Sequence, residues 1–158
     1  MFHVVLLEPE IPPNTGNIAR LCAATRSTLH LVEPLGFQIE DRHLRRAGMD
    51  YWQHLQWRRW PDWPSFLQHH GPSPRIWFIE QRAPRPYHAV RFEPGDILAF
   101  GRESTGLPRP LLEAARERWL DIPMSHPDCR SLNLSNCVAI VLFEALRQQS
   151  VPAAWQNP

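Results

Sequence analysis

The sequence predicts an α/β fold in which helices cover both faces of a mostly parallel β-sheet. Short apolar runs of strand length alternate along the chain with stretches whose apolar residues recur at helical spacing, and this alternation is typical of a parallel sheet. The chain has 158 residues, of which 43% are hydrophobic, enough for one domain with a full core. We therefore expect a single domain at residues 1–150 and a frayed polar tail at residues 151–158.

The chain is expected to open with a strand, a helix and a second strand. Residues 2–7 are an aliphatic run that stops at Glu8 and Pro9, as a buried strand would. Asn14 is the predicted N-cap of a helix with Ile18 and Cys22 on its apolar face, and residues 29–32 are the next strand. Weaker signals then predict a short helix at residues 41–46, a strand at residues 55–57 and a short helix at residues 64–69.

The second half repeats the alternation. Its predicted elements are central strands at residues 75–79 and 96–100, a helix at residues 110–118, a strand at residues 119–122 and a final helix from Leu134 onward. Pro108 is placed to open the first of these helices, and Ser131 or Asn133 to cap the last. Because ligands bind at the carboxyl ends of parallel strands, the loops after residues 79, 100 and 122 form the predicted binding crevice.

Several protein classes are disfavoured by missing motifs. The sequence has no GxGxxG and, because it contains no lysine, no GxxxxGK loop, so neither a dinucleotide-dependent oxidoreductase nor a P-loop nucleotide hydrolase is favoured. Cys22, Cys129 and Cys137 form no CxxC pair, which favours buried thiols in a reducing compartment over disulfides or a metal site. No apolar run approaches the roughly 18 residues of a membrane span. We expect a cytoplasmic protein without metal or membrane attachment.

A surface for nucleic acid would have to be local, because the net charge is only +1. One stretch interleaves guanidinium groups with aromatic rings, a combination that suits splayed RNA bases. Its members are Arg42, Arg45, Arg46, Tyr51, Trp52, Trp57, Arg58, Arg59 and Trp60. The same tryptophans could instead be core or dimer-interface anchors, and the sequence does not separate these two interpretations.

Three motifs carry a resemblance to a known family. They are residues 8–20 (EPEIPPNTGNIAR), residues 100–108 (FGRESTGLP) and residues 130–136 (RSLNLSN). Together they resemble the motifs of the SPOUT superfamily of RNA methyltransferases, and most of all its short, single-domain tRNA 2'-O-methyltransferases that act on cytidine or uridine at the wobble position. The resemblance implies a homodimer that transfers the methyl group of S-adenosylmethionine to a ribose 2'-hydroxyl in the tRNA anticodon loop.

The resemblance also implies where the site lies. In SPOUT enzymes the last segment is threaded into a deep trefoil knot, which sequence rules alone would not suggest, since knotted chains are rare. The knotted loops hold the cofactor, which assigns cofactor contacts to Ile79, Gly101, Ile122 and Ser131. The family motifs also imply that Arg20 lies over the ribose hydroxyl. Asn14, Glu103 and Asn133, with Ser131, would complete the catalytic site.

Other interpretations stay open on the residues alone. The segment between Gly101 and Gly106 could be an ordinary strand-to-helix turn, and Arg20 could be an exposed surface charge. Within the resemblance, the chain could methylate another tRNA or rRNA position. It could also be a non-catalytic RNA-binding protein that keeps the fold, although the complete first motif with Arg20 argues against that.

Overall fold

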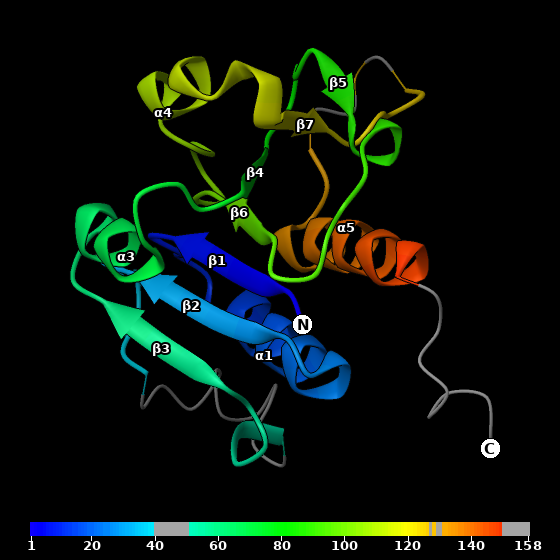
Figure 1. Cartoon of the computed structure of the whole chain (residues 1–158). Coiled ribbons are helices and arrows are strands. Elements are labelled where there is room, and N and C mark those ends of the chain that lie inside the picture. Colours follow the sequence, from blue (N-terminus) through cyan, green and yellow to red (C-terminus); the bar gives the residue numbers. More distant parts are fainter. Residues whose placement is uncertain (40–50, 127, 129–130, 150–158) are drawn as a thin grey trace, which may run out of the picture.

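The computed structural model describes residues 1–39, 51–126, 128 and 131–149. Within these residues the chain forms a seven-stranded sheet of order β3-β2-β1-β6-β4-β7-β5, in which all paired strands are parallel (Figure 1). The strands are β1 (His3–Leu7), β2 (Thr28–Val32), β3 (Trp57–Trp60), β4 (Ile76–Ile79), β5 (Arg85–Pro86), β6 (Ile97–Phe100) and β7 (Trp119–Asp121). The α/β fold class with a parallel sheet is therefore confirmed.

Helices cover both faces of this sheet. The α-helices are α1 (Pro12–Thr25), α3 (Trp63–His70), α4 (Arg109–Ala114) and α5 (Leu134–Gln148), and two short 3-10 helices are η1 (Tyr87–Ala89) and η2 (Arg116–Arg118). Side chains alternate along β1, so Val4 and Leu6 pack in the core beneath α1 and α5, whereas Val5 and Leu7 pack in the core beneath α3 and α4. None of the described helices has the length and apolarity needed to cross a membrane.

Several predicted boundaries are wrong. Asn14 is not an N-cap, because α1 already begins at Pro12 and the cap position falls on Ile11, with no side-chain cap bond. Two prolines in the first turn fit there because the N–H that proline lacks has no helical partner. The strand predicted at residues 55–57 is β3, while Leu55 is a core residue ahead of it.

The helix predicted at residues 110–118 is two elements. Pro108 occupies the cap position of α4, which ends at Ala114, and residues 116–118 form η2. Strand β5 was not expected, because only two residues at the sheet edge form it and one is a proline. The other predicted elements are present to within one or two residues, and Asn133 is confirmed as the N-cap of α5. The helix predicted at residues 41–46 and the tail at residues 151–158 lie outside the described residues.

The strand order brings four loops together. Strands β1, β6, β4 and β7 are consecutive neighbours, so the segments that follow them emerge at one edge of the sheet. The chain builds outward from β1 through β2 to β3, then changes direction to β4, β6 and β7 on the other side of β1. A change of direction of this kind leaves a crevice at the carboxyl ends of parallel strands, where ligands bind.

Candidate active site

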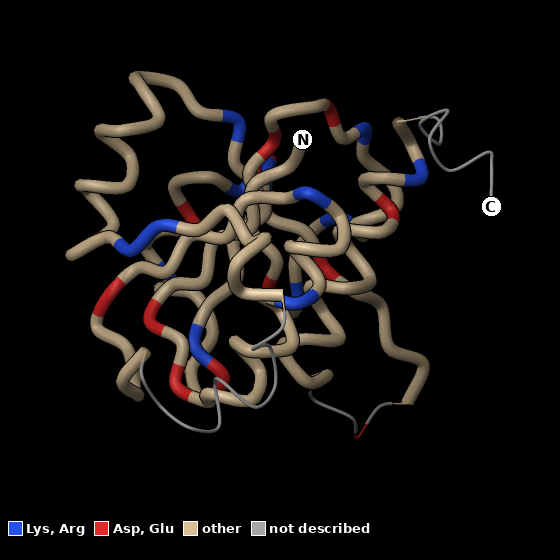
Figure 2. Tube along the Cα trace, turned by 90° about the horizontal axis from the view of Figure 1, so that it is seen from below, with Lys and Arg blue, Asp and Glu red and all other residues tan. Residues whose placement is uncertain are grey.

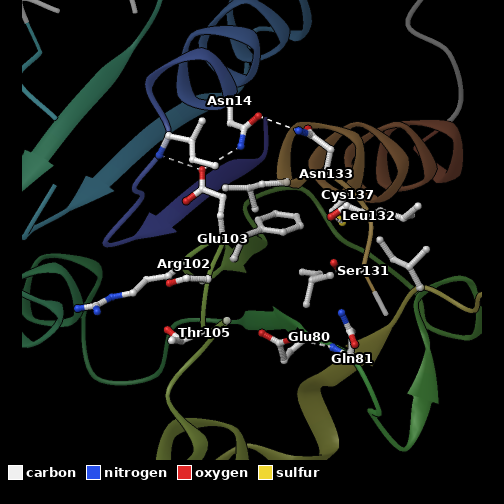
Figure 3. A pocket seen from close by; sticks show the side chains of 18 of the residues that line it. Asn14, Glu80, Gln81, Arg102, Glu103, Thr105, Ser131, Leu132, Asn133 and Cys137 are labelled. Carbon is white, nitrogen blue, oxygen red and sulfur yellow. Dashed lines mark hydrogen bonds between the residues drawn. The ribbon is translucent and has the colours of Figure 1, made fainter. Parts of the chain in front are cut away.

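A cavity of about 560 Å³ occupies this edge of the sheet (Figure 3). The loops after β4, β6 and β7 form its walls together with the N-termini of α1 and α5. The described lining residues are Ile11, Asn14, Ile79, Glu80, Gln81, Phe100, Gly101, Arg102, Glu103, Ser104, Thr105, Gly106, Asp121, Ile122, Met124, Ser131, Leu132, Asn133, Leu134 and Cys137. The crevice predicted from the strand ends therefore exists, and the segments after β1, β4, β6 and β7 all supply its residues.

The structure brings nearly all of the predicted site residues to this cavity. The four proposed cofactor contacts, Ile79, Gly101, Ile122 and Ser131, all line it, and so do Asn14, Glu103 and Asn133. Their common location follows from the sheet order, because residues 14, 103 and 133 each lie close behind a strand or at a helix start on the same edge. Among the described residues, only Arg20 of the predicted set is absent from the lining.

A chain of hydrogen bonds joins the three sequence motifs. Asn133 donates from Nδ2 to Asn14 Oδ1 at 2.8 Å, and Asn14 donates from Nδ2 to Glu103 Oε1 at 3.0 Å (Figure 3). Asn133 Oδ1 in turn accepts from the backbone N–H of Ser135, at 2.9 Å, and so caps α5. In this chain each amide nitrogen faces an oxygen acceptor and each amide oxygen faces a donor, which fixes the orientation of both side-chain amides.

Glu103 lies at the start of α1 and accepts three hydrogen bonds there. Besides Asn14, its oxygens accept from the backbone N–H of Glu10 at 2.8 Å and of Ile11 at 3.3 Å. The positive end of the α1 dipole also favours a negative charge at this position. Glu103 therefore joins the loop after β6 to the loop after β1.

A second set of contacts joins the same two loops. The Glu10 carboxylate accepts from the backbone N–H of Ser104 at 2.9 Å and from its hydroxyl at 2.8 Å. Arg102 forms an ion pair with Glu8, and Figure 3 shows its side chain extending away from the cavity. Glu10 and Glu103 thus each accept hydrogen bonds from the opposite loop. Two separate sets of hydrogen bonds therefore join the two loops at this wall of the cavity.

Gly101 and Gly106 allow the loop after β6 to fold tightly. The backbones of Arg102 and Gly106 exchange two hydrogen bonds, with N to O distances of 3.3 Å and 2.9 Å. A Cβ at Gly101 would lie 2.2 Å from the Gly106 carbonyl carbon, which no side chain can occupy. Gly106 has a φ of +70°, and a Cβ there would lie 2.0 Å from Glu80 Oε2. The two glycines are needed for this loop to close, which an ordinary turn would not demand at both positions.

Arg20 points elsewhere. It lies on the exposed side of α1, with its guanidinium carbon 4.8 Å from the centroid of the Tyr51 ring and Nη2 3.4 Å from the Tyr51 hydroxyl oxygen. Such a cation–π contact at an exposed site is weak, worth roughly 0.5–1 kcal/mol. Within one chain, Arg20 and the cavity are therefore separate features.

Sequence reasoning missed Glu80, Asp121 and Leu132, which line the cavity. The first two stand at or directly after the ends of β4 and β7, and this position was the signal that could have identified them. Partial burial raises the pKa of the Asp121 carboxyl above its usual value, against two backbone hydrogen bonds that lower it. Burial, and secondly the negative charge of Glu80, raise the pKa of the Cys137 thiol to about 11. Cys137 is therefore a neutral thiol at neutral pH.

The arginine and tryptophan stretch is only partly a free surface. Trp52 and Trp57 pack against the α1 and α5 core with ring centroids 5.3 Å apart, and Trp60 donates from its indole to His30 Nδ1 at 3.1 Å. These contacts favour the interpretation of the tryptophans as packing anchors. Arg58 and Arg59 are exposed, the first beside His69 and the second paired with Glu33. Arg42, Arg45 and Arg46 lie outside the described residues.

Charge is interspersed over the chain. Figure 2 shows basic and acidic positions of the described residues intermixed along the trace in that view. Cys22 and Cys137 are free thiols, and Cys129 is not among the described residues. No group of three or more histidine, cysteine, aspartate or glutamate side chains in the described part of the chain is arranged to hold a metal ion.

Comparison with known proteins places this geometry in a family. The sequence profile of the SpoU rRNA Methylase family matches residues 1–143. The chain belongs to the SpoU rRNA methylase family. The predicted resemblance to RNA methyltransferases is thereby confirmed, and with it the prediction that the chain is an enzyme.

Two curated relatives of this family match nearly the whole chain. A tRNA (cytidine(34)-2'-O)-methyltransferase from Burkholderia pseudomallei is 51% identical over 150 residues, which are 94% of this chain and 96% of the relative. The protein of the same name from Escherichia coli K12 is 46% identical over 155 residues, 98% of each chain.

Solved structures of the family share the fold. One, described as giving structural insights into the 2-OH methylation of C/U34 on tRNA, is 43% identical with a TM-score of 0.90, and the match covers 95% of this chain and 97% of that one. An AdoMet-bound rRNA methyltransferase from Sinorhizobium meliloti is 24% identical with a TM-score of 0.81, covering 92% of this chain and 56% of that one. At that identity the second likeness shows the fold alone.

Proposed function

We propose that this protein transfers the methyl group of S-adenosylmethionine to the ribose 2'-hydroxyl of the wobble nucleotide of tRNA. The observation that carries the proposal is the hydrogen-bonded chain from Asn133 through Asn14 to Glu103, which joins all three methyltransferase motifs around one cavity. Relatives at about half identity over almost the full length of this chain carry that activity in their names. Because tRNA is the proposed substrate, we expect the protein to act in the cytoplasm.

The cavity suits a nucleoside cofactor. Its wall combines apolar side chains such as Ile79, Ile122 and Leu132 with the backbone of the tight loop at Gly101, and cofactor pockets are mostly apolar with a few fixed polar groups. The backbone groups can recognise an adenine edge, and the apolar side chains can enclose its ring. When bound, the cofactor supplies an electrophilic methyl group on a sulfonium.

Asn14, Glu103 and Asn133 are proposed as positioning residues. Their side-chain hydrogen bonds are made to one another and to the starts of α1 and α5, so they fix the distance between the cofactor loops and α1. Precise alignment of the hydroxyl with the methyl group is the main task left to the protein, and small displacements there are costly in rate. Ser131, exposed at the cavity edge, is available for contact with the cofactor or ribose.

Arg20 is proposed as the group that stabilises negative charge on the attacking ribose oxygen. A guanidinium is always protonated in proteins, so it acts as a fixed cation and donor and not as a base. Because Arg20 lies outside the cavity of its own chain, its role is most simply met if it acts on a substrate held between two copies.

We accordingly propose a homodimer. The apolar faces of α1 and α5 are occupied by the core and do not supply the contact, since Ile18, Cys22, Val138 and Val141 are fully buried. The outward side of α5 instead presents Phe143, whose surface is 47% exposed. An exposed aromatic side chain of this kind is a typical interface anchor.

The trefoil knot is also part of this proposal. Threading of the last segment would stack the loops after β4, β6 and β7 into a rigid pocket, which the family resemblance implies and the match over residues 1–143 supports. We further propose that residues 1–150 act as one domain.

The deciding experiment maps 2'-O-methylation in tRNA from cells that lack the protein and from the same cells carrying the gene again. We expect one methylated wobble ribose to disappear and return. Loss of methylation at another tRNA or rRNA position would identify a different RNA substrate. Unchanged methylation throughout, together with RNA binding by the purified protein, would favour the non-catalytic alternative.

A further inference from the structure

The side chain that stands out in the cavity beyond the three motifs is Glu80. It follows β4 directly, is half-buried, and lies in Figure 3 on the side of the cavity opposite Asn14 and Glu103. Its Oε2 accepts from the backbone N–H of Leu107 at 2.8 Å, and its Oε1 accepts from the backbone N–H of Gln81 at 2.9 Å. These two bonds fix the carboxylate in place between two cavity loops.

The contacts that Glu80 makes with the described residues leave its charge uncompensated. An ionised carboxylate has about four acceptor positions, of which two are used, and both partners are neutral amides. No arginine or histidine ion pair with Glu80 is present among the described residues. The field of Glu80 also reaches the α5 wall, since it contributes to the raised pKa of the Cys137 thiol.

The other charged groups around the cavity do not cancel it. Of the described lining residues only Arg102 is basic, and it is paired with Glu8. Glu103 is engaged with the start of α1, and Asp121 adds a further acidic side chain. Arg82 and Arg109 line a neighbouring cavity that shares Glu80, but not this one, and Arg109 is paired with Glu113.

We propose that Glu80 makes the cavity prefer the positively charged methyl donor to its uncharged demethylated product. This inference rests on the proposed function. S-adenosylmethionine carries a sulfonium and an ammonium against one carboxylate, for a net charge of +1, whereas S-adenosylhomocysteine has lost the sulfonium charge. An unpaired carboxylate in a partly desolvated cavity attracts the first more than the second. Glu80 is thus a specificity-determining residue that favours exchange of product for fresh donor after each transfer.

Calorimetry with three probes tests this assignment. The probes are S-adenosylmethionine, S-adenosylhomocysteine and sinefungin, in which an amine replaces the methylsulfonium and restores the positive charge. In Glu80→Gln we expect affinity for the two cationic probes to fall by about threefold to tenfold, with less than about a twofold change for S-adenosylhomocysteine. Glu117→Gln, exposed on η2 and outside the lining of this cavity, is the matched control and should change none of the three.

A second measurement uses the parental protein, so its result does not depend on whether the Glu80→Gln substitution disturbs the loops. Raising salt from about 0.05 M to about 0.5 M should weaken binding of the cationic probes relative to S-adenosylhomocysteine, because screening acts on charge. Equal losses for all three probes in Glu80→Gln, or a salt effect shared by all three, would mean that Glu80 only shapes the loops and would overturn the inference. Failure of the unchanged protein to bind any probe would instead overturn the proposed function.

Discussion

Asn133 and Asn14 stand 119 positions apart in the chain, yet their side-chain amides meet at 2.8 Å over the cavity. Asn133 caps α5 with its oxygen and uses its nitrogen to contact α1, so one side chain sets both the start of the last helix and its distance from the first. Asn14 in turn donates a hydrogen bond to Glu103. Three motifs that are remote in sequence therefore depend on one line of hydrogen bonds.

Asn14→Asp tests that line. Asn14 is only 6% exposed, and the substitution replaces a donor 3.0 Å from Glu103 Oε1 by a second carboxylate. We expect a loss of about 2–4 kcal/mol in the free energy of unfolding at neutral pH, measured with urea. Repulsion between the two carboxylates raises the pKa of one of them in the folded variant. The difference in unfolding free energy between variant and parent should therefore shrink as pH falls. Asn17→Asp, exposed on the same helix, should change the free energy of unfolding little. Equal losses in the two variants would contradict this account.

Gly101→Ala is expected to damage the fold of the cavity loop. The new Cβ would lie 2.2 Å from backbone carbon of Gly106, which cannot move without breaking the tight turn. We expect a loss above about 2 kcal/mol in unfolding free energy, and loss of S-adenosylmethionine binding by calorimetry. Gly71→Ala provides the comparison for binding, because Gly71 lies away from the cavity with open space around it. Its φ of +86° and ψ of −175° are strained for any other residue, so the substitution should cost about 1–3 kcal/mol in unfolding free energy but leave cofactor binding unchanged.

Arg20→Ala should separate binding from transfer. Because Arg20 lies outside the cavity, cofactor affinity is expected to stay at the parental value while methyl transfer to saturating tRNA falls roughly a hundredfold or more. Arg20→Lys should recover part of the rate, since the charge remains and the planar fork is lost. Arg116→Ala, on η2, is the control for a general loss of positive charge. A parental rate in Arg20→Ala would show that the residue is an ordinary surface charge.

Stability should fall as the solution becomes acidic. His30 is 2% exposed; burial, with the nearby His3, His70, Arg58 and His69, lowers its pKa from 6.5 to about 3. Because the pKa of His30 is lower in the folded protein than in the unfolded chain, the unfolded chain takes up a proton first as pH falls. The stabilisation that neutral His30 provides is therefore present above pH 6.5 and is lost as pH falls toward the folded pKa. For His30 alone we expect about 2 kcal/mol less unfolding free energy at pH 5 than at pH 7.

His30→Gln provides the check on that assignment. It can still accept from Trp60, now 3.1 Å from His30 Nδ1, but has no titrating group, so the pH slope should be smaller. His88→Gln, outside this cluster, should keep the parental slope. Identical pH dependence in all three proteins would place the titrating groups elsewhere.

Phe143→Asp tests whether the proposed dimer forms through the outward side of α5. A carboxylate in place of the exposed ring should leave the monomer folded, because the ring packs on no described core cluster, but should disfavour burial between copies. Sedimentation is expected to show a dimer for the parent and a monomer for the variant, with cofactor binding kept and methyl transfer reduced. A parent that is monomeric at micromolar concentration yet fully active would refute a shared site.

The sequence predicted the parallel sheet well, because buried strands such as residues 97–100 are short unbroken apolar runs between polar turns. It misplaced the start of α1, because the preference of asparagine for N-caps was given more weight than the two preceding prolines. The common location of the site residues came from the family resemblance and from the rule on strand ends. The pairing of Glu10 with Ser104 and of Glu103 with α1 carries no local signal, since each bond joins loops about 90 residues apart. Glu80 differs from these pairings, because its position directly after β4 was a signal that could have identified it.

The contact between Asn14 and Asn133 also fixes when the cavity can exist during synthesis. Strand β1 is central in the sheet and emerges early, but its neighbour β6 follows about 90 residues later and the capping residue of α5 later still. Long-range pairing of this kind is slow to form. A nascent chain that lacks α5 has its central strands but no complete pocket wall, so capture of the methyl donor reports that the whole chain has folded.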